Sequence, residues 1–300
     1  MNSAEWKISV QKKIYFMTKN IWDGLRQNEV DTFLSNFKRN EEVGLALMEM
    51  LIFYSLEQEV LLASAAFKQF KRQIWLKTFI NNGEKRDSCY INKYFHAFFK
   101  DTCFVPLEET DPSGSAFSIA NIYKRVKKFP KEIEFVNIQD VPLMIALRKK
   151  CIVLYDDVIG TGTQFSTFWN DTNHFGRNKV SLNMLAQKNK DVQFYYLVFG
   201  ANKNKLEELS KKFPNIVILT AEQYEPEDSV LNENNEYWEF NPQLKDKVIE
   251  YVSNKILELK INNEFGSNIP VLFQHCRAQN TSLPLYWVNK PGNWKELYKR

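Results

Sequence analysis

The sequence predicts an α/β protein built on a parallel sheet, with a helical region before the sheet and an extension after it. Three observations predict this class. Residues 1–88 carry apolar side chains at helical spacing. Residues 89–235 alternate short apolar runs with helix-like segments, a pattern typical of parallel sheets. Residues 236–300 hold one more helical pattern and two short apolar segments. We therefore expect three segments with these boundaries.

The first segment is helical in pattern because nothing in it interrupts a helix. Apolar residues recur at three- and four-residue steps, and one such series is Leu47, Met50, Leu51 and Tyr54. Glycine is sparse in this segment and proline is absent. The first clear loop is NNGEKRDS, at residues 81–88. It predicts the end of the helical region.

The strands expected in the middle segment are short apolar runs. VQFYYLVFG is the clearest, because β-branched and aromatic residues fill it and a glycine ends it. The other expected strands are CFVPL, IEFVNI, CIVLY and NIVILT. The helices expected near them are SAFSIANIYKRVKKF, FSTFWNDTNHF and KNKLEELSKKF. In the last segment PQLKDKVIEYVSNKILELK predicts a helix, since its proline suits a first helical position.

The overall charge is mildly basic. The formal net charge of +4 falls short of the excess expected of a dedicated nucleic-acid-binding protein. The basic stretch NIYKRVKKFPK is interpreted as the solvated end of a helix. Nucleic acid as a partner stays open but is not favoured.

The chain carries no pattern of export or membrane insertion. The four cysteines are scattered without a CxxC pair, which argues against a zinc site and for a reducing compartment. The most apolar stretch is interrupted by Glu49, Glu57 and Glu59, each costly at membrane depth. We expect a soluble cytoplasmic protein with no membrane partner.

The most informative stretch is YDDVIGTGTQF, residues 155–165, which follows the apolar run CIVL. Ligands of open parallel sheets bind beyond the carboxyl ends of the strands, and Asp156 and Asp157 would be delivered to that edge. The loop after them would lead into a helix whose first N–H groups suit a phosphate. Gly160 and Gly162 would let the backbone approach closely, and the hydroxyls of Thr161 and Thr163 could add hydrogen bonds.

Two carboxylates beside a phosphate would repel it unless something lies between them. A sugar whose hydroxyls donate to the carboxylates, with a divalent cation nearby, resolves this conflict. The stretch thus predicts a ligand with a phosphate at one end and a ribose diol in the middle. The alternative is a strand end that exposes two solvated acids before a glycine turn.

The stretch IVLYDDVIGTGTQF resembles the phosphoribosyl-pyrophosphate (PRPP) motif of type I phosphoribosyltransferases. The resemblance implies that Asp156 and Asp157 hold the ribose hydroxyls. It implies a 5′-phosphate site made by Thr161, Gly162 and Thr163 with the backbone around Gly160 and Gln164. Magnesium would come with the PRPP-like ligand, with no metal held directly by the protein. Gly160 and Gln164 depart from the threonines common at these positions.

These enzymes also need a loop for the pyrophosphate. DPSGSAF, residues 111–117, follows the expected strand CFVPL and opens a helix. Ser113, Gly114 and Ser115 could supply backbone and hydroxyl donors there. An ordinary helix cap explains the same residues equally well.

A wider resemblance covers most of the chain. FLSNF and LIFYS in the helical front, DPSGS, DDVIGTGTQF and the closing LPLYW together resemble phosphoribosyltransferase-like proteins with a C-terminal extension. That family is met in bacterial conflict and antiphage systems. The resemblance implies a role in defence alongside partner proteins.

Two functions fit this sequence. One is a transferase or nucleotide-acting enzyme, in which PRPP or a related nucleotide reacts at the anomeric carbon by positioning and electrostatic support. Such chemistry needs no side-chain nucleophile, and none is expected here, since Ser166 and Cys276 lack a recognisable base partner. The other is an inactive pocket that senses PRPP or a nucleotide and switches contacts within a defence complex. The first is favoured.

Overall fold

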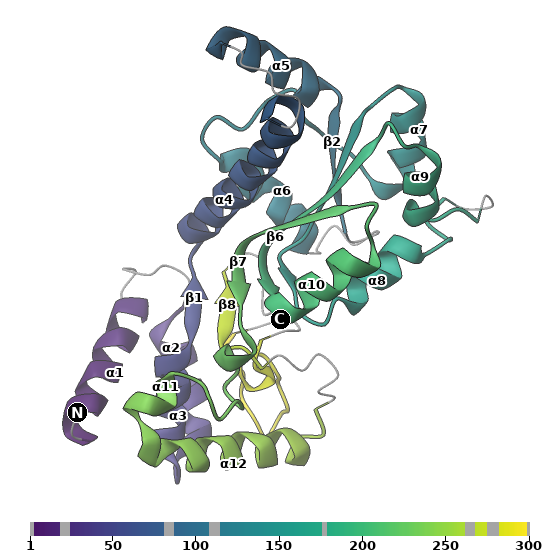
Figure 1. Cartoon of the computed structure of the whole chain (residues 1–300). Coiled ribbons are helices and arrows are strands. Elements are labelled where there is room, and N and C mark those ends of the chain that lie inside the picture. The colour runs from purple at the N-terminus through teal and green to yellow at the C-terminus, as the bar shows by residue number, and fades with distance from the viewer. Residues whose placement is uncertain are drawn as a thin grey trace. The chain divides into compact units, whose positions relative to one another are not determined.

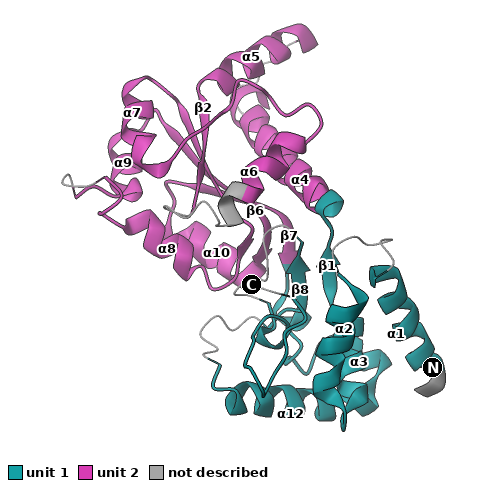
Figure 2. Cartoon of the chain, turned by 180° about the vertical axis from the view of Figure 1, so that it is seen from behind, with its two compact units in different colours: residues 1–58, 224–300 teal, residues 59–223 magenta. Residues whose placement is uncertain are grey.

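The structure is a computed structural model of the 300-residue chain. It describes residues 3–18, 25–80, 87–107, 115–175, 179–261, 268–274 and 282–298. These residues form two compact units, coloured separately in Figure 2. Unit 1 comprises residues 1–58 and 224–300, and unit 2 comprises residues 59–223.

Unit 2 is built on a six-stranded sheet (Figure 1). The strands pair in the order β3, β2, β4, β6, β5, and β7 also pairs with β6. Every pair whose register is defined, from β2–β3 to β5–β6, is parallel, which confirms the predicted α/β class. The bounds are β2 Thr102–Pro106, β3 Glu134–Phe135, β4 Cys151–Tyr155, β5 Val158–Ile159, β6 Gln193–Asn202 and β7 Val217–Tyr224.

β4 and β5 both pair with β6, and they do so in the same register. Cys151 pairs with Gln193 and Val158 with Gly200, so both strands advance in step along the same neighbour. They are interrupted only at residues 156–157. All five residues of β4 are buried, as expected of a central parallel strand. The break therefore lies at the carboxyl end of a buried strand.

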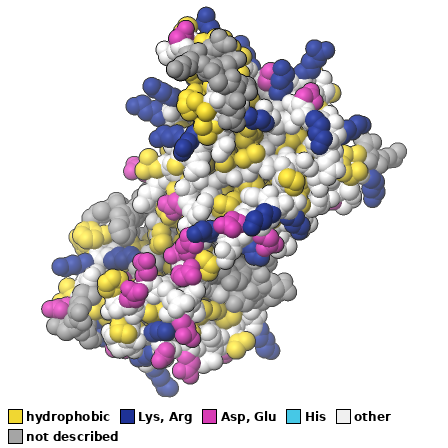
Figure 3. Space-filling view, in the orientation of Figure 1, with side chains coloured by type: hydrophobic (Ala, Val, Ile, Leu, Met, Phe, Trp, Pro, Cys, Tyr) yellow, Lys and Arg dark blue, Asp and Glu magenta, His cyan; other side chains and the backbone are white. Residues whose placement is uncertain are grey.

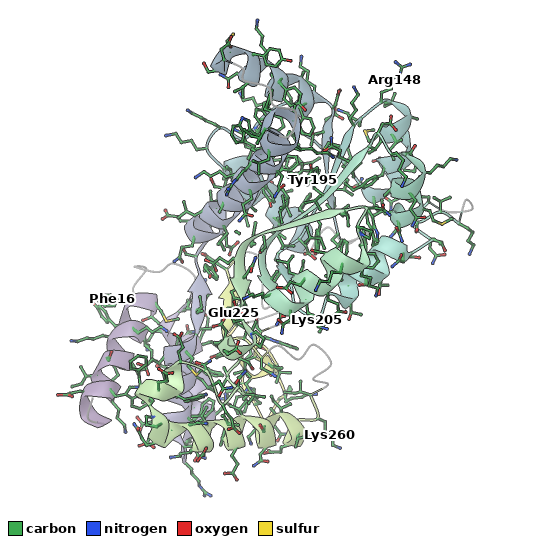
Figure 4. The ribbon with its side chains drawn as sticks, in the orientation of Figure 1. Phe16, Arg148, Tyr195, Lys205, Glu225 and Lys260 are labelled. Atoms are coloured by element: carbon green, nitrogen blue, oxygen red, sulfur yellow. The ribbon has the colours of Figure 1, made fainter. Side chains whose placement is uncertain are left out.

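Helices cover both faces of this sheet. On one face lie α7 (Val141–Ala146), α8 (Thr163–Asn170), α9 (Leu182–Lys188) and α10 (Lys203–Lys212), whose apolar residues share a core with alternate residues of β4 and β6. The other face packs α4 (Leu56–Trp75), α5 (Ser88–Lys100) and α6 (Ser115–Arg125). There the ring of Phe70 lies 4.9 Å from that of Tyr195 of β6. Figure 4 labels Tyr195. A π-helical turn, Leu76–Ile80, ends α4.

Unit 1 joins segments from both ends of the chain. It contains α1 (Ser3–Thr18), α2 (Gln27–Leu34), α3 (Glu41–Met50), β1 (Ile52–Tyr54), α11 (Tyr237–Phe240), α12 (Pro242–Glu258) and β8 (Val271–Phe273). β1 and β8 form a parallel two-stranded sheet. The rings of Phe33 and Phe37 contact that of Trp294, so α2 and the residues after it share one core with the C-terminal segment.

One sequence expectation is wrong. The helical series that runs through Leu47, Met50 and Tyr54 breaks after Met50, because Leu51 adopts φ −56°, ψ 124° and Ile52–Tyr54 form β1. Pairing with β8, more than 200 residues later, supplies hydrogen bonds that no local pattern contains. The β-branched and aromatic residues of IFY favour a strand once that partner exists.

The predicted segment boundaries after residues 88 and 235 stay predictions, since the compact units group the chain by packing and not by sequence order. Among the described residues, no helix is both long and apolar enough to cross a membrane.

Candidate ligand-binding site

The two adjacent acids occupy the break between β4 and β5. The N–H of Asp156 donates to the carbonyl of Leu197 at 3.1 Å, and the carbonyl of Asp157 accepts from the N–H groups of Phe199 and Gly200. The backbone of both acids is therefore tied to β6. Their side chains differ in exposure, since Asp156 is only 3% exposed and Asp157 is half-buried.

The carboxylates accept backbone donors from within the motif. Asp156 Oδ1 accepts from the N–H of Asp157 at 2.9 Å, and Asp157 Oδ1 accepts from the N–H of Val158 at 2.6 Å. Such bonds fix the rotamers of both side chains. The two acids are thus held in place before any ligand arrives.

Tyr196 of β6 supplies a further donor to this pair. Its hydroxyl donates to Asp156 Oδ2 at 3.3 Å, and its ring stacks on Phe165 of α8 at 4.6 Å with an interplanar angle of 10°. Burial, followed by the charges of Asp156 and Asp157, raises the pKa of Tyr196 well above its ordinary value. The phenol therefore keeps its proton and remains a hydrogen-bond donor.

The glycine loop leads directly into α8. Gly162 precedes the helix with φ +75°, a left-handed conformation that favours glycine. A Cβ atom there would lie 2.8 Å from Leu209 Cδ1 of α10, so the position has no space for a side chain. Gly160 is buried as well. The loop backbone is thus packed closely against the body of unit 2.

Thr161 and Thr163 organise the start of the helix. Thr161 Oγ1 lies 3.0 Å from Thr163 Oγ1 and accepts from the N–H of Thr163 at 3.3 Å. Thr163 and Gln164 are exposed, and Thr161 is half-buried. The start of a helix whose first residues are exposed, beside two hydroxyls, can bind an anion such as phosphate at the positive end of the helix dipole.

The acids and the loop are connected through one side chain. Tyr196 binds Asp156 through its hydroxyl and α8 through Phe165, the third residue of that helix. Nothing in the sequence analysis singled out Tyr196. The alternation along β6 could have indicated it, because Phe194, Tyr196 and Val198 point to the same face of the sheet.

The predicted pyrophosphate loop is only partly placed. Ser113 and Gly114 lie outside the described residues, and Ser115 is the first residue of α6. The strand before it ends beside the motif, since Pro106 pairs with Tyr155 and the N–H of Leu107 donates to the carbonyl of Tyr155 at 3.1 Å. The roles of Ser113, Gly114 and Ser115 stay predictions.

Other polar features lie apart from the motif. His96 Nδ1 lies 3.0 Å from Glu132, and His174 Nε2 lies 2.7 Å from the carbonyl of Phe168. Among the described residues, no three His, Cys, Asp or Glu side chains gather closely enough to hold a metal. An open cavity of about 490 Å³ belongs to unit 1 and is lined mostly by α12. It contains no motif residue.

Comparison with known protein families identifies the family to which this chain belongs. A model of the PRTase-CE family, which is phosphoribosyltransferase-like with a C-terminal extension, matches residues 30–300. The chain belongs to the PRTase-CE family. No curated protein and no solved structure matches it. Membership covers both compact units, and agrees with a phosphoribosyltransferase-like parallel core, an N-terminal helical region and a C-terminal extension.

Membership also bears on the class of ligand. The family is transferase-like, and membership points to a general class of ligand, namely nucleotides or PRPP-type molecules. The motif at residues 155–165 lies within the matched range and entirely in unit 2.

Proposed function

We propose that this PRTase-CE protein binds PRPP, or a nucleotide with the same phosphate–ribose layout, at Asp156, Asp157 and residues 160–164. One observation carries the proposal. Both acids and the glycine loop are fixed by unit 2 itself, with Tyr196 bonded to Asp156 and stacked on the helix that the loop begins. A site ordered in advance loses less entropy when its ligand binds.

The two ends of the motif suit different parts of such a ligand. The ribose hydroxyls donate to the carboxylates of Asp156 and Asp157. The 5′-phosphate accepts hydrogen bonds from the backbone around Gly160 and Gln164 and from the hydroxyls of Thr161 and Thr163. Gly162 lets the loop adopt the left-handed turn that begins α8 and pack against Leu209.

The reaction that fits this site is transfer of the phosphoribosyl group. The bond between the anomeric carbon and the pyrophosphate oxygen breaks, and pyrophosphate leaves with the bonding electrons. The acceptor forms a new bond to that carbon and loses a proton. The protein holds the sugar in position and supports the charge that develops.

Magnesium fits this scheme as a companion of the ligand. Each oxygen of Asp156 already accepts one hydrogen bond from the protein, and Asp156 is buried, so the half-buried Asp157 is the acid better suited to face a ligand-bound cation. The cation would neutralise part of the charge on the pyrophosphate.

A second candidate function is a PRPP or nucleotide sensor without turnover. The burial of Asp156, at 3% exposure, favours it, because a carboxylate occupied by the protein's own donors contributes less to a changing transition state. In this case ligand binding would alter contacts with partner proteins. For either candidate we propose a role in bacterial antiphage defence, on the resemblance described above.

The test is calorimetric titration of the full chain with PRPP and magnesium. Asp156→Asn with Asp157→Asn should weaken binding at least about 100-fold, since two charge-assisted hydrogen bonds are lost. Asp191→Asn is the control, an exposed acid two residues before β6. Equal affinity in the double variant and the control would overturn the site.

The same samples separate the two candidate functions. Pyrophosphate released in the presence of trial acceptors would identify a transferase. Bound PRPP that stays intact with every acceptor would favour the sensor.

A further inference from the structure

The two compact units differ in charge. The sequence of unit 2 contains 24 Lys and Arg against 17 Asp and Glu, a net charge of +7. Unit 1 contains 16 and 19, a net charge of −3, and the two together give the +4 of the whole chain. The mild overall value therefore hides a basic unit. Both acids of the proposed ligand site belong to unit 2. The excess of Lys and Arg in this unit therefore lies away from that site.

The excess is concentrated between residues 68 and 133. That stretch of sequence has 13 Lys and Arg against seven Asp and Glu. Among its described residues the numbers are eleven and three. We name as the basic surface the exposed side chains of α4, α5 and the end of α6 with the segment after it: Lys68, Lys71, Arg72, Lys93, Lys100, Lys124, Arg125, Lys127, Lys128 and Lys131.

Side-chain contacts hold these elements together. The ring of Phe129, after α6, lies 4.9 Å from that of Phe67 of α4. Lys71 of α4 lies over the ring of Phe95 of α5, and His96 of α5 contacts Glu132 at 3.0 Å. The basic side chains are therefore carried by one packed set of elements. Figure 3 shows mostly Lys and Arg among the charged side chains over this part of the molecule.

These cations have few acids to pair with. The three described acids of the stretch are Asp87, which caps α5, Asp101, and Glu132, which contacts His96. Among the described residues, no ion pair joins an acid to a member of the basic surface. Unpaired cations on one surface repel each other. A bound polyanion would neutralise their charge and relieve that repulsion.

We propose that the basic surface binds the phosphate backbone of nucleic acid. The choice of partner follows from composition, because lysine is depleted at protein–protein interfaces but is a standard contact to phosphates. Two partly exposed rings accompany the cations, Trp75 at the end of α4 and Tyr90 of α5. Aromatic side chains beside cations also suit unpaired bases. This surface lies on the helices opposite α8 and α10, so it is separate from the proposed PRPP site.

The test compares two charge-matched variants of the full chain. The first is Lys68→Glu, Lys127→Glu and Lys131→Glu, and the control is Lys188→Glu, Lys190→Glu and Lys211→Glu on and beside α9 and α10. All six lysines are exposed, and both variants change the net charge equally. Affinity for a fluorescent 20-base-pair DNA duplex and for a 20-nucleotide single strand is measured between 50 and 200 mM salt.

We expect the first variant to lose at least about 10-fold in affinity at 100 mM salt, with the log–log salt slope for the duplex reduced by about 2 to 3. The control should bind like the wild type. A wild type that binds neither DNA at 50 mM salt, or equal losses in both variants, would overturn the proposal. Tighter binding to poly-glutamate than to DNA would also overturn the proposal, because it would indicate that the partner of the basic surface is an acidic protein and not nucleic acid. A Gln version of each triple variant covers the case in which Glu disturbs folding.

Discussion

At the scale of single residues, Gly162 is constrained twice. Its φ of +75° disfavours any side chain, and Leu209 Cδ1 occupies the place of a Cβ atom. Gly292 has a similar φ of +82° but nothing within 4 Å of its missing Cβ. The pair therefore separates the cost of the backbone conformation from the cost of the close contact.

We predict that Gly162→Ala destabilises the protein by about 2 to 4 kcal/mol, since left-handed strain and overpacking add. Gly292→Ala should cost only about 1 to 2 kcal/mol, because strain acts alone. Urea unfolding of both variants checks this. Equal costs would mean that Leu209 moves aside freely.

Tyr196 provides a second prediction at this scale. Tyr196→Phe removes the hydroxyl that donates to Asp156 but keeps the ring that stacks on Phe165. The free energy of unfolding should fall by about 0.5 to 1.5 kcal/mol, the net value of one hydrogen bond. Affinity for ribose 5-phosphate should also fall, because the carboxylate of Asp156 loses a contact that holds it in place. Affinity for 2-deoxyribose 5-phosphate should fall less, because that sugar makes fewer contacts with the acids.

Tyr195→Phe is the control for this prediction. Tyr195 is the preceding residue of β6, faces the opposite side of the sheet, and donates to Gln193 at 3.0 Å. Its variant should bind both sugars like the wild type. If Tyr196→Phe weakens the two sugars equally, the hydroxyl does not act on the diol.

At the scale of secondary-structure elements, Lys13 joins α1 to the end of α3. Its ammonium group donates to the carbonyls of Glu49 and Leu51, the latter at 2.9 Å. The carboxylate of Glu49 in turn accepts from Trp6 and from the hydroxyl of Tyr237. Burial is the main cause that lowers the pKa of Lys13 from 10.5 to about 8.

This shift predicts that stability rises with pH above about 8. Between the two pKa values the unfolded chain still holds a proton that the folded protein has released, so higher pH favours folding. The slope reaches at most about 1.4 kcal/mol per pH unit. Above pH 10 the trend reverses, because burial raises the pKa values of Tyr237 and Tyr286 and only the unfolded tyrosines ionise.

Urea midpoints measured from pH 7 to 9.5 check this slope. Lys13→Met should remove it, and Lys12→Met, a change at the exposed neighbour, should leave it intact. A slope that survives in Lys13→Met would assign the effect to another group.

The elements also show what the sequence could and could not predict. CIVLY and VQFYYLVFG were identifiable because buried parallel strands are continuous apolar runs, and they form β4 and β6. α5 was missed, since its aromatic residues have no strong helix preference and its cap, Asp87, lies in an expected loop. β1 was missed because its partner β8 is distant in the chain.

Part of the candidate site was likewise visible in the sequence, and part forms only in the folded protein. Asp156, Asp157 and the glycine loop are adjacent in sequence, so their local order was visible. Tyr196 and Leu209 reach the motif from β6 and α10, and only the folded sheet brings them there.

At the scale of the whole molecule, unit 1 depends on its C-terminal segment. The hydroxyl of Tyr286 donates to the carbonyl of Leu47 at 2.6 Å, and Trp294 fills the core beside Phe33 and Phe37. We predict that deleting residues 269–300 increases hydrogen exchange in α2 and α3, although both helices precede residue 51.

Amides of β4 and β6 should keep their protection in this truncated chain, because their partners all lie in unit 2. Protection that remains unchanged in α3 would mean that the N-terminal helices are stable without the C-terminal segment.

The parallel pairing of β1 with β8 has a consequence for synthesis on the ribosome. The two strands are more than 200 residues apart, a delay of roughly 10 to 40 s at ordinary elongation rates. During that interval α2 and α3 have left the ribosome without the side chains that cover them, while every strand of unit 2 is translated and can pair. The helices α2 and α3 are translated before unit 2 and therefore finish folding after it, and a nascent-chain chaperone would find its apolar surface there.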